Sequence, residues 1–313
     1  MYEIFVAIIT GTVQGITEFL PISSTAHNFL VSNLLGKSVD LEISNIIQFG
    51  TLIAIIQFYF SDLKAFGKRL WQVITNQSEF KDFFNNIRMW WDDDTIDDKD
   101  ITTLPKNMMV DSTIFQLIIA TIPIVITALL MRKVVEVGLR TPAWIGFFMI
   151  VGAVLLAVAD WYYSRSKTKK VKILDKLNVI TIGIFQSFAI FPGMSRSGSC
   201  LAGSYFIGVD KTVAIRFAFL LSIPALGLSG VNDMFSYLKK NYQNISLLPD
   251  SNPNTSFSVL SIVIGTTCAY FVGLICLRWL LNYLAKHSFN VFIFYRILIG
   301  FLLIALTGVG VIK

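Results

Sequence analysis

The chain has 313 residues, of which 54% are hydrophobic and 15% are charged, and its net charge is +6. Soluble domains carry charge on about a quarter of their residues, so this composition, with a mean hydropathy of +0.66, excludes a soluble globular protein. The lysines and arginines lie mostly between apolar blocks, which is how membrane proteins set their orientation and which argues against nucleic acid as a partner.

The N-terminal apolar stretch, residues 4–30, is interrupted by polar residues, and no basic segment precedes it, so we expect no cleaved signal peptide. A second interrupted stretch spans residues 178–202. Six other blocks are uninterrupted and long enough to cross a bilayer as helices. These blocks span residues 43–60, 113–131, 143–161, 211–230, 258–278 and 292–312. The pattern predicts an all-α membrane protein, a polytopic helical bundle with two re-entrant helical hairpins.

The two halves of the chain resemble each other. Gln14 and Gln186, and then Pro21 and Pro192, recur at a nearly constant offset, and a serine-rich turn follows each proline. Three spanning blocks follow each hairpin, which indicates an internal repeat. The predicted repeats are residues 1–161 and 178–313.

The basic segment 162–177 predicts the orientation of the chain. Its lysines and arginines far outnumber its single acid, Asp175, so we expect it on the cytoplasmic side. Loops 31–42, 132–142 and 231–257 are then external, and the two halves are inverted relative to each other. Paired broken segments in inverted repeats indicate a binding site near the middle of the membrane.

Segment 61–112 is predicted to be a long cytoplasmic loop that holds half of the chain's acidic residues. The run Asp92-Asp93-Asp94 and the pair Asp97-Asp98 lack the glycine and glutamate of an EF-hand, so we interpret the loop as solvated. The aromatic residues of its front half are compatible with interfacial amphipathic helices.

Chemically useful residues gather in the first hairpin. Gln14 and Glu18 are four positions apart and share one face of a helix. Ser24 and His27 are three apart and meet on one face if a new helix starts at Pro21. The N–H groups at such a helix start bind anions, phosphates above all. Here they belong to Ser23, Ser24 and Thr25.

The second hairpin carries Arg196 between Ser195 and Ser197, followed by Gly198. Arginine is a bidentate partner for phosphate, and a charged residue in a membrane segment is a functional candidate. Single residues of these kinds are more often packing or ion-pair partners, which is how we interpret His287 and the three cysteines. The combination of an acid, hydroxyls, a histidine and an arginine on two matched hairpins favours a functional site.

The two hairpins carry long motifs. The run Gln14-Gly15-Ile16-Thr17-Glu18-Phe19-Leu20-Pro21-Ile22-Ser23-Ser24-Thr25-Ala26-His27 resembles the first signature of the bacterial undecaprenyl-diphosphate phosphatases, the bacitracin-resistance family. The run Pro192-Gly193-Met194-Ser195-Arg196-Ser197-Gly198 resembles the second. The motifs occur in order, and the likeness covers nearly the whole chain. Gln14 leaves Glu18 as the only charge of its motif, Ala26 stands where many members have glycine, and segment 61–112 is longer and more acidic than expected.

The resemblance implies hydrolysis of undecaprenyl diphosphate to undecaprenyl phosphate and inorganic phosphate at the outer face of the bacterial inner membrane. This reaction recycles the lipid carrier of cell-wall synthesis and confers resistance to bacitracin. The resemblance also implies a divalent cation, Mg²⁺ or Ca²⁺, for which Glu18 is the candidate ligand. The expected partners are the polyprenyl diphosphate lipid and the membrane, and a homodimer is an alternative to a monomer.

For this reaction the sequence predicts Ser24 as the nucleophile and His27 as its general base. Arg196 would stabilise the phosphoryl oxygens, and Glu18 would orient His27 or hold a cation. The residues predicted to bind the diphosphate are Gln14, Ser23, Thr25, Ser195, Ser197 and Gly198. Alternatively, His27 is itself the nucleophile or activates a water.

The rival function is a transporter or flippase of an anionic or lipid-linked substrate, because inverted repeats with broken helices are the usual plan of secondary transporters. Transport needs an anion site but no nucleophile and base, so the spacing of Ser24 and His27 favours the enzyme. A purely structural membrane subunit would not need charged residues in its hairpins.

Overall fold

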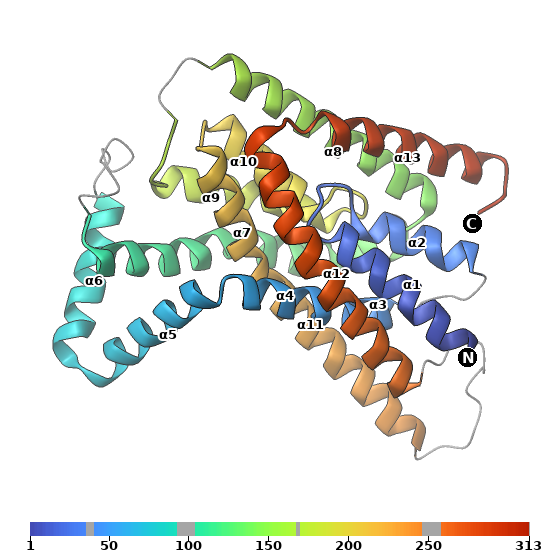
Figure 1. Ribbon diagram of the computed structural model, residues 1–313, viewed down its shortest axis with the longest axis horizontal. Helices are drawn as coiled ribbons and strands as arrows, with labels where there is room; N and C mark the ends of the chain where they lie inside the picture. Colours follow the sequence, from blue (N-terminus) through green and yellow to red (C-terminus); the bar gives the residue numbers. More distant parts are fainter. Residues whose placement is uncertain (36–40, 93–103, 167–169, 246–257, 313) are drawn as a thin grey trace.

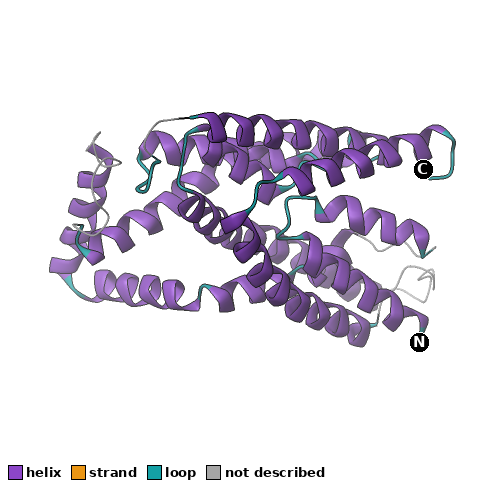
Figure 2. Cartoon of the chain, turned by 45° about the horizontal axis from the view of Figure 1, so that its top comes forward, coloured by secondary structure: helices purple, strands orange, loops and turns teal. Residues whose placement is uncertain are grey.

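The computed structural model describes residues 1–35, 41–92, 104–166, 170–245 and 258–312, and helices make up most of them (Figures 1 and 2). These residues contain no strand, only one bridge between Val171 and Val209. Five of the described helices are long and apolar enough to cross a membrane, and a bent pair is a sixth candidate. The five are Lys106–Met131, Pro142–Arg165, Lys211–Val231, Val259–Lys286 and Asn290–Gly308. The prediction of an all-α polytopic membrane protein is therefore confirmed.

Both predicted hairpins are helix–turn–helix units. The first consists of α1 (Tyr2–Thr17) and α2 (Ser24–Leu34). The second consists of α9 (Lys176–Ser187), the short 3-10 helix η3 (Phe188–Ile190) and α10 (Arg196–Phe206). The prolines stop the first helix of each unit because they cannot donate the backbone hydrogen bond that a helix interior needs.

The front half of segment 61–112, for which the sequence allowed amphipathic helices within a long loop, is helical. The chain first forms α3 (Leu41–Ile47) and α4 (Phe49–Phe58). After α4 it bends by 77° and continues as α5 (Phe60–Thr75), which is followed by α6 (Gln77–Asp92). Charged and apolar residues alternate here at helical spacing, so these helices are amphipathic and contain no uninterrupted apolar block. The acidic residues 93, 94, 97 and 98 lie outside the described residues.

Two further predicted loops are partly helical. Helix α7 (Lys106–Gly138) runs through most of segment 132–142, and α11 (Lys211–Ile245) runs into segment 231–257, the rest of which is not described until residue 258. A spanning helix does not have to end where its apolar block ends, because charged residues with good helix propensity continue it into water. The remaining helices are α8 (Pro142–Arg165), α12 (Val259–Lys286) and α13 (Asn290–Gly308).

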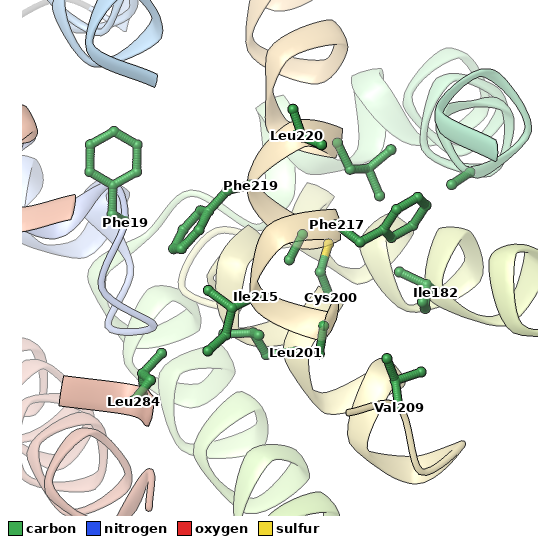
Figure 3. Close-up of a cluster of buried hydrophobic side chains, with 14 of the residues drawn as sticks. Phe19, Ile182, Cys200, Leu201, Val209, Ile215, Phe217, Phe219, Leu220 and Leu284 are labelled. Carbon is green, nitrogen blue, oxygen red and sulfur yellow. The ribbon is translucent and has the colours of Figure 1, made fainter. Parts of the chain in front are cut away.

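Small residues let the helices approach closely, as is usual in membranes. Helix α1 packs along α12, and α9 packs along α7. A Cβ added at Gly11 would lie 2.1 Å from the carbonyl oxygen of Gly265. The turn of the first hairpin enters the main core, where the Phe19 ring meets that of Phe219 edge to face at 5.9 Å (Figure 3). The core thus fixes the first turn against α11.

Candidate active site

The two hairpin turns share an unusual backbone feature. Ser23 has φ 74° and Ser195 has φ 66°, and they are the only non-glycine residues with positive φ among those described. Each serine caps the following helix: the Ser23 hydroxyl accepts from the N–H of Ala26 at 3.5 Å, and the Ser195 hydroxyl accepts from that of Gly198 at 3.3 Å. Left-handed backbone at such residues is costly and collects at functional sites. Both turns are therefore candidates for function.

A single buried arginine holds the two turns together. Arg296 of α13 is fully buried and donates from Nη1 to the carbonyl of Pro21 at 3.1 Å. Its Nη2 donates to the carbonyls of Gly193 at 3.1 Å and Met194 at 2.8 Å, and its Nε donates to that of Met149 at 3.1 Å. All of these acceptors are neutral, and the described residues show no ion pair for Arg296. The guanidinium thus places a charge beneath both turns.

Glu18 is the hub of the polar network. Its Oε2 accepts from the Ser24 hydroxyl at 2.9 Å and from Gln14 Nε2 at 2.9 Å, and its Oε1 pairs with Arg196 Nη2 at 3.1 Å. The network continues from Gln14 Oε1 to Asn28 Nδ2 at 2.7 Å. The structure therefore brings together the acid, one hydroxyl, one amide and the arginine that the sequence singled out.

Arg196 keeps one free donor atom. Its side chain is 10% exposed, and its Nη1 is buried without a hydrogen-bond partner. An unpaired buried donor on a charged group is expensive, and a phosphate oxygen would satisfy it. The Arg196 guanidinium therefore joins Glu18 on one side and has capacity for an anion.

His27 does not face Ser24 in the way that its spacing suggested. Its Nδ1 lies 2.7 Å from the carbonyl oxygen of Ser23, so Nδ1 carries a hydrogen. In the neutral ring, Nε2 then accepts from the hydroxyl of Tyr295 at 2.7 Å, and the two rings stack with centroids 5.5 Å apart. The two residues share a helix, but the ring turns toward α13 while the Ser24 hydroxyl turns toward Glu18.

The other predicted residues fall into two groups. Thr25 is exposed on the first turn of α2. Ser195, Ser197 and Gly198 are buried, with the hydroxyls of Ser195 and Ser197 3.2 Å apart and that of Ser197 bonded to the carbonyl of Leu20 at 3.3 Å. Ser197 thus joins the second turn to the first, whereas the N–H of Gly198 bonds to Ser195 within the second turn.

A cavity of about 530 Å³ lies over the turns. Its polar lining includes Glu18, Ser23, Ser24, Thr25, Ser195 and Arg196. Most of its apolar lining comes from α7 and α11, through residues that include Ile124, Val125, Leu129, Leu226 and Leu228, and the rest comes from η3 and Phe191. The cavity therefore offers anion-binding groups and a hydrocarbon surface side by side, and His27 is not among its lining residues.

The family of this chain follows from its similarity to known proteins. The model of the family described as bacitracin resistance protein BacA matches residues 7–302. The chain belongs to this family. It is similar to proteins named undecaprenyl-diphosphatase from Chlorobium phaeovibrioides (32% identical), Prosthecochloris aestuarii (31%) and Micrococcus luteus (31%). In each case the alignment covers 98% of both chains.

The side chains that line the cavity of this BacA family member do not by themselves form a metal site. The described residues hold no group of three or more histidine, cysteine or acidic side chains that could bind an ion. Glu18 is a lone carboxylate whose oxygens already accept from Gln14, Ser24 and Arg196. A cation here would need oxygen ligands from the substrate, as Mg²⁺ commonly has.

Sequence reasoning missed Arg296, Tyr295 and Asn28. The sequence did indicate Arg296, because it is a charged residue inside the last apolar block and is therefore a functional candidate for the same reason as Arg196. Nothing in the sequence indicated Tyr295 or Asn28, because aromatic and amide side chains are common in such helices. Their contacts with His27 and Gln14 exist only in the folded chain.

Proposed function

We propose that this protein hydrolyses undecaprenyl diphosphate to undecaprenyl phosphate and inorganic phosphate, and so recycles the lipid carrier of cell-wall synthesis and confers bacitracin resistance. The observation that carries the proposal is the cavity that places Glu18, Ser24 and Arg196 beside the apolar walls of α7 and α11. A polyprenyl diphosphate has the same two parts, a polyanionic head and a hydrocarbon tail. The name and full-length similarity of the curated relatives support the same reaction.

In the proposed mechanism Ser24 is the nucleophile. Its Oγ attacks the terminal phosphorus, the bond from that phosphorus to the bridging oxygen breaks, and undecaprenyl phosphate leaves with the bridging oxygen. Glu18 Oε2, which already accepts the Ser24 hydrogen bond, takes the proton. Glu18 then passes this proton to the departing undecaprenyl phosphate. A water attacks the phosphorus of the phosphoserine and gives its proton to Glu18, the P–Oγ bond breaks, and Glu18 returns the proton to Oγ, which leaves inorganic phosphate and the free serine.

Two arginines supply the electrostatics of this reaction. The free Nη1 of Arg196 is suited to the phosphoryl oxygens, whose negative charge rearranges in the transition state. Arg296 adds a second positive charge behind the turns while it fixes their carbonyls. His27, bonded to Ser23 and Tyr295, holds the first turn in shape rather than serving as the base that the sequence suggested. No step passes through a metal ion, and a divalent cation would enter with the diphosphate.

We infer that the cavity opens to the outer side of the inner membrane. Arg140, in the turn just before α8, lines the cavity, whereas the lysine-rich segment 162–177 follows the other end of α8. The positive-inside rule assigns that segment to the cytoplasm. The cavity and the basic segment are thus at opposite ends of one spanning helix.

The two inverted repeats, residues 1–161 and 178–313, also remain our proposal. Support comes from the matching serines with positive φ and from matching pairs within the hairpins. Asn28 bonds to Gln14, and at the equivalent positions the Cys200 thiol lies 3.8 Å from Gln186 Oε1.

The test is release of inorganic phosphate by purified protein in detergent from long-chain polyprenyl diphosphate. We expect turnover that is abolished in Ser24→Ala, with the variant still folded. Detergent removes any gradient, so a transporter would release no phosphate. A parallel reaction with a chelator tests the proposed divalent cation, and size measurement in detergent tests the homodimer.

A further inference from the structure

Helices α5 and α6 carry an apolar surface that the proposed reaction does not use. On α5, apolar residues recur every three or four positions on one face, and most of that face is exposed. The exposed members are Phe60, Leu70, Trp71 and Ile74, and Trp71 is 68% exposed and Ile74 78%. On α6 the exposed apolar residues are Phe80, Phe84, Met89 and Trp91. Two neighbouring helices thus expose large apolar side chains.

The inner side of the same pair is polar and tightly bonded. Arg69 of α5 is buried and donates to both carboxylate oxygens of Asp111 on α7, at 2.7 and 2.8 Å. Glu79 also pairs with Arg69, and Asn86 donates to Asp111 at 2.8 Å. The pair therefore buries an ion-pair cluster around Arg69 against α7 while several of its large apolar side chains are exposed.

A further contact ties this pair to the bundle. The indole N–H of the buried Trp90 donates to the carbonyl of Leu174 at 2.7 Å, and Gln116 of α7 donates to the same oxygen at 3.0 Å. Helix α6 is therefore fixed in position near the basic segment before α9. The exposed face is consequently a built feature of the fold and not the side of a loosely attached hairpin.

Basic residues border the apolar face. Lys64 and Lys68 are exposed on α5, one helical turn apart, and Lys81 is exposed on α6. Arg88 is also exposed and pairs with Asp92 at 3.3 Å. The exposed lysines exclude α5 from the hydrocarbon core, although α5 and the helices before it are together long and apolar enough to cross a membrane. An apolar face with a lysine border is the pattern of a helix that lies in the headgroup layer.

The bend before α5 sets the direction of α5 relative to the membrane. The helical segment Ile43–Phe58 and the segment Phe60–Thr75 differ in direction by 77°. If the first segment crosses the membrane, the second runs nearly along its surface. Ile53 of α4 and Phe60 of α5 are both exposed, so the lipid-facing surface continues across the bend.

We propose that α5 and α6 form a rigid platform that lies in the headgroup layer, with its apolar face in the lipid and with its lysines on anionic lipid headgroups. The occupant of the exposed face is therefore bilayer lipid. Figure 1 shows the pair at the left edge of the bundle, and among the described residues none covers its exposed apolar side chains. The platform does not depend on the proposed reaction.

The experiment uses the full chain in nanodiscs with a spin label at a single cysteine. Cys268 and Cys276 are replaced by alanine, and the buried Cys200 is kept. Labels go at Ile74→Cys and Phe84→Cys on the apolar face, and at the exposed neighbour Asn85→Cys as the matched control. Collision rates are measured with oxygen, which concentrates in lipid, and with a water-soluble nickel chelate.

We expect the labels at 74 and 84 to be reached by oxygen and shielded from nickel, and the label at 85 to show the reverse. Nickel access at 74 and 84 equal to that at 85 would overturn the platform. Dipolar broadening between labels at 74 on two chains would also overturn it, because a second copy would then cover the face. Helix content and phosphate release of each variant, compared with the parent, verify that it folds.

A second arm tests the anionic preference. Adding phosphatidylglycerol to phosphatidylcholine nanodiscs should move the label at 84 deeper, and the variant Lys64→Gln/Lys68→Gln/Lys81→Gln should lose this response. Equal depth in both lipid mixtures would overturn the headgroup contact.

Discussion

Ser24 and Glu18 form the hydrogen bond on which the proposed chemistry depends, with Oγ 2.9 Å from Oε2. The two residues lie on different helical segments of the first hairpin, one just after α1 and one at the start of α2. The turn between them, braced by Arg296, therefore sets the distance between nucleophile and proton acceptor.

Ser24 and Glu18 should act as one unit. Ser24→Ala and Glu18→Gln are each expected to lower phosphate release by about three orders of magnitude or more, with the double variant little worse than either. Thermal stability in detergent is measured beside activity, because Glu18 also pairs with Arg196. Losses that multiply in folded protein would show that the two residues act independently.

Arg196→Lys should lower activity strongly although it keeps the charge. Lysine cannot contact Glu18 and a phosphate at the same time with a fork of donors, as the guanidinium can. The measurement is the turnover number at saturating substrate. Turnover near that of the parent would exclude the proposed phosphate contact.

Tyr295 should act through His27. Tyr295→Phe keeps the ring but removes the donor to Nε2, and because this contact is only partly buried the unpaired nitrogen should cost near the lower end of about 1–3 kcal/mol. We expect lower thermal stability and lower activity, with the variant His27→Ala/Tyr295→Phe no worse than His27→Ala alone. Higher activity in Tyr295→Phe would instead mean that the Tyr295 hydroxyl blocks Nε2 of His27 from accepting the Ser24 proton. His27 would then be the general base that its spacing from Ser24 predicted.

Gly152→Ala should disrupt the site from a distance. The added Cβ would lie 2.0 Å from Arg296 Nη2 and 2.9 Å from the carbonyl oxygen of Met194. Overpacking of this kind costs about 1–3 kcal/mol, so both melting temperature and activity should fall. Gly67→Ala is the matched control, because nothing lies within 4 Å of its added Cβ. Equal behaviour of the two variants would contradict the bracing role of Arg296.

Orientation can be checked by labelling spheroplasts with an impermeant thiol reagent. Asn33→Cys, at the exposed end of α2, should react, and Lys172→Cys, in the basic segment, should not. Cys268 and Cys276 are replaced beforehand. The opposite pattern would put the cavity on the cytoplasmic side.

Five of the six predicted spans, and the breaks in the two hairpins, were predictable because long apolar blocks and the prolines Pro21 and Pro192 have strong physical signals. The predicted span 43–60 is instead two short helices that pass as a span only together with α5. The aromatic residues of segment 61–112 indicated amphipathic helices in its front half, but they gave no signal for the buried contact of Arg69 with Asp111 that joins α5 to α7. The residue types of the site were predictable as well, but not their pairing. A spacing of three shows that Ser24 and His27 share a helix face, yet it does not set the side-chain rotamers, and partners from α13 decided where the imidazole turned.

The bonds of Arg296 also limit how the molecule can move. One guanidinium joins the carbonyls of Pro21, Gly193 and Met194, so the two turns form a single mechanical unit. Hydrogen bonds from a charged group are worth about 1.5–3 kcal/mol each. Any rocking of one half of the chain against the other that separates the turns must break several of them together. An alternating-access cycle would therefore meet a barrier at its pivot, whereas hydrolysis of a lipid headgroup that enters sideways from the bilayer requires no such separation.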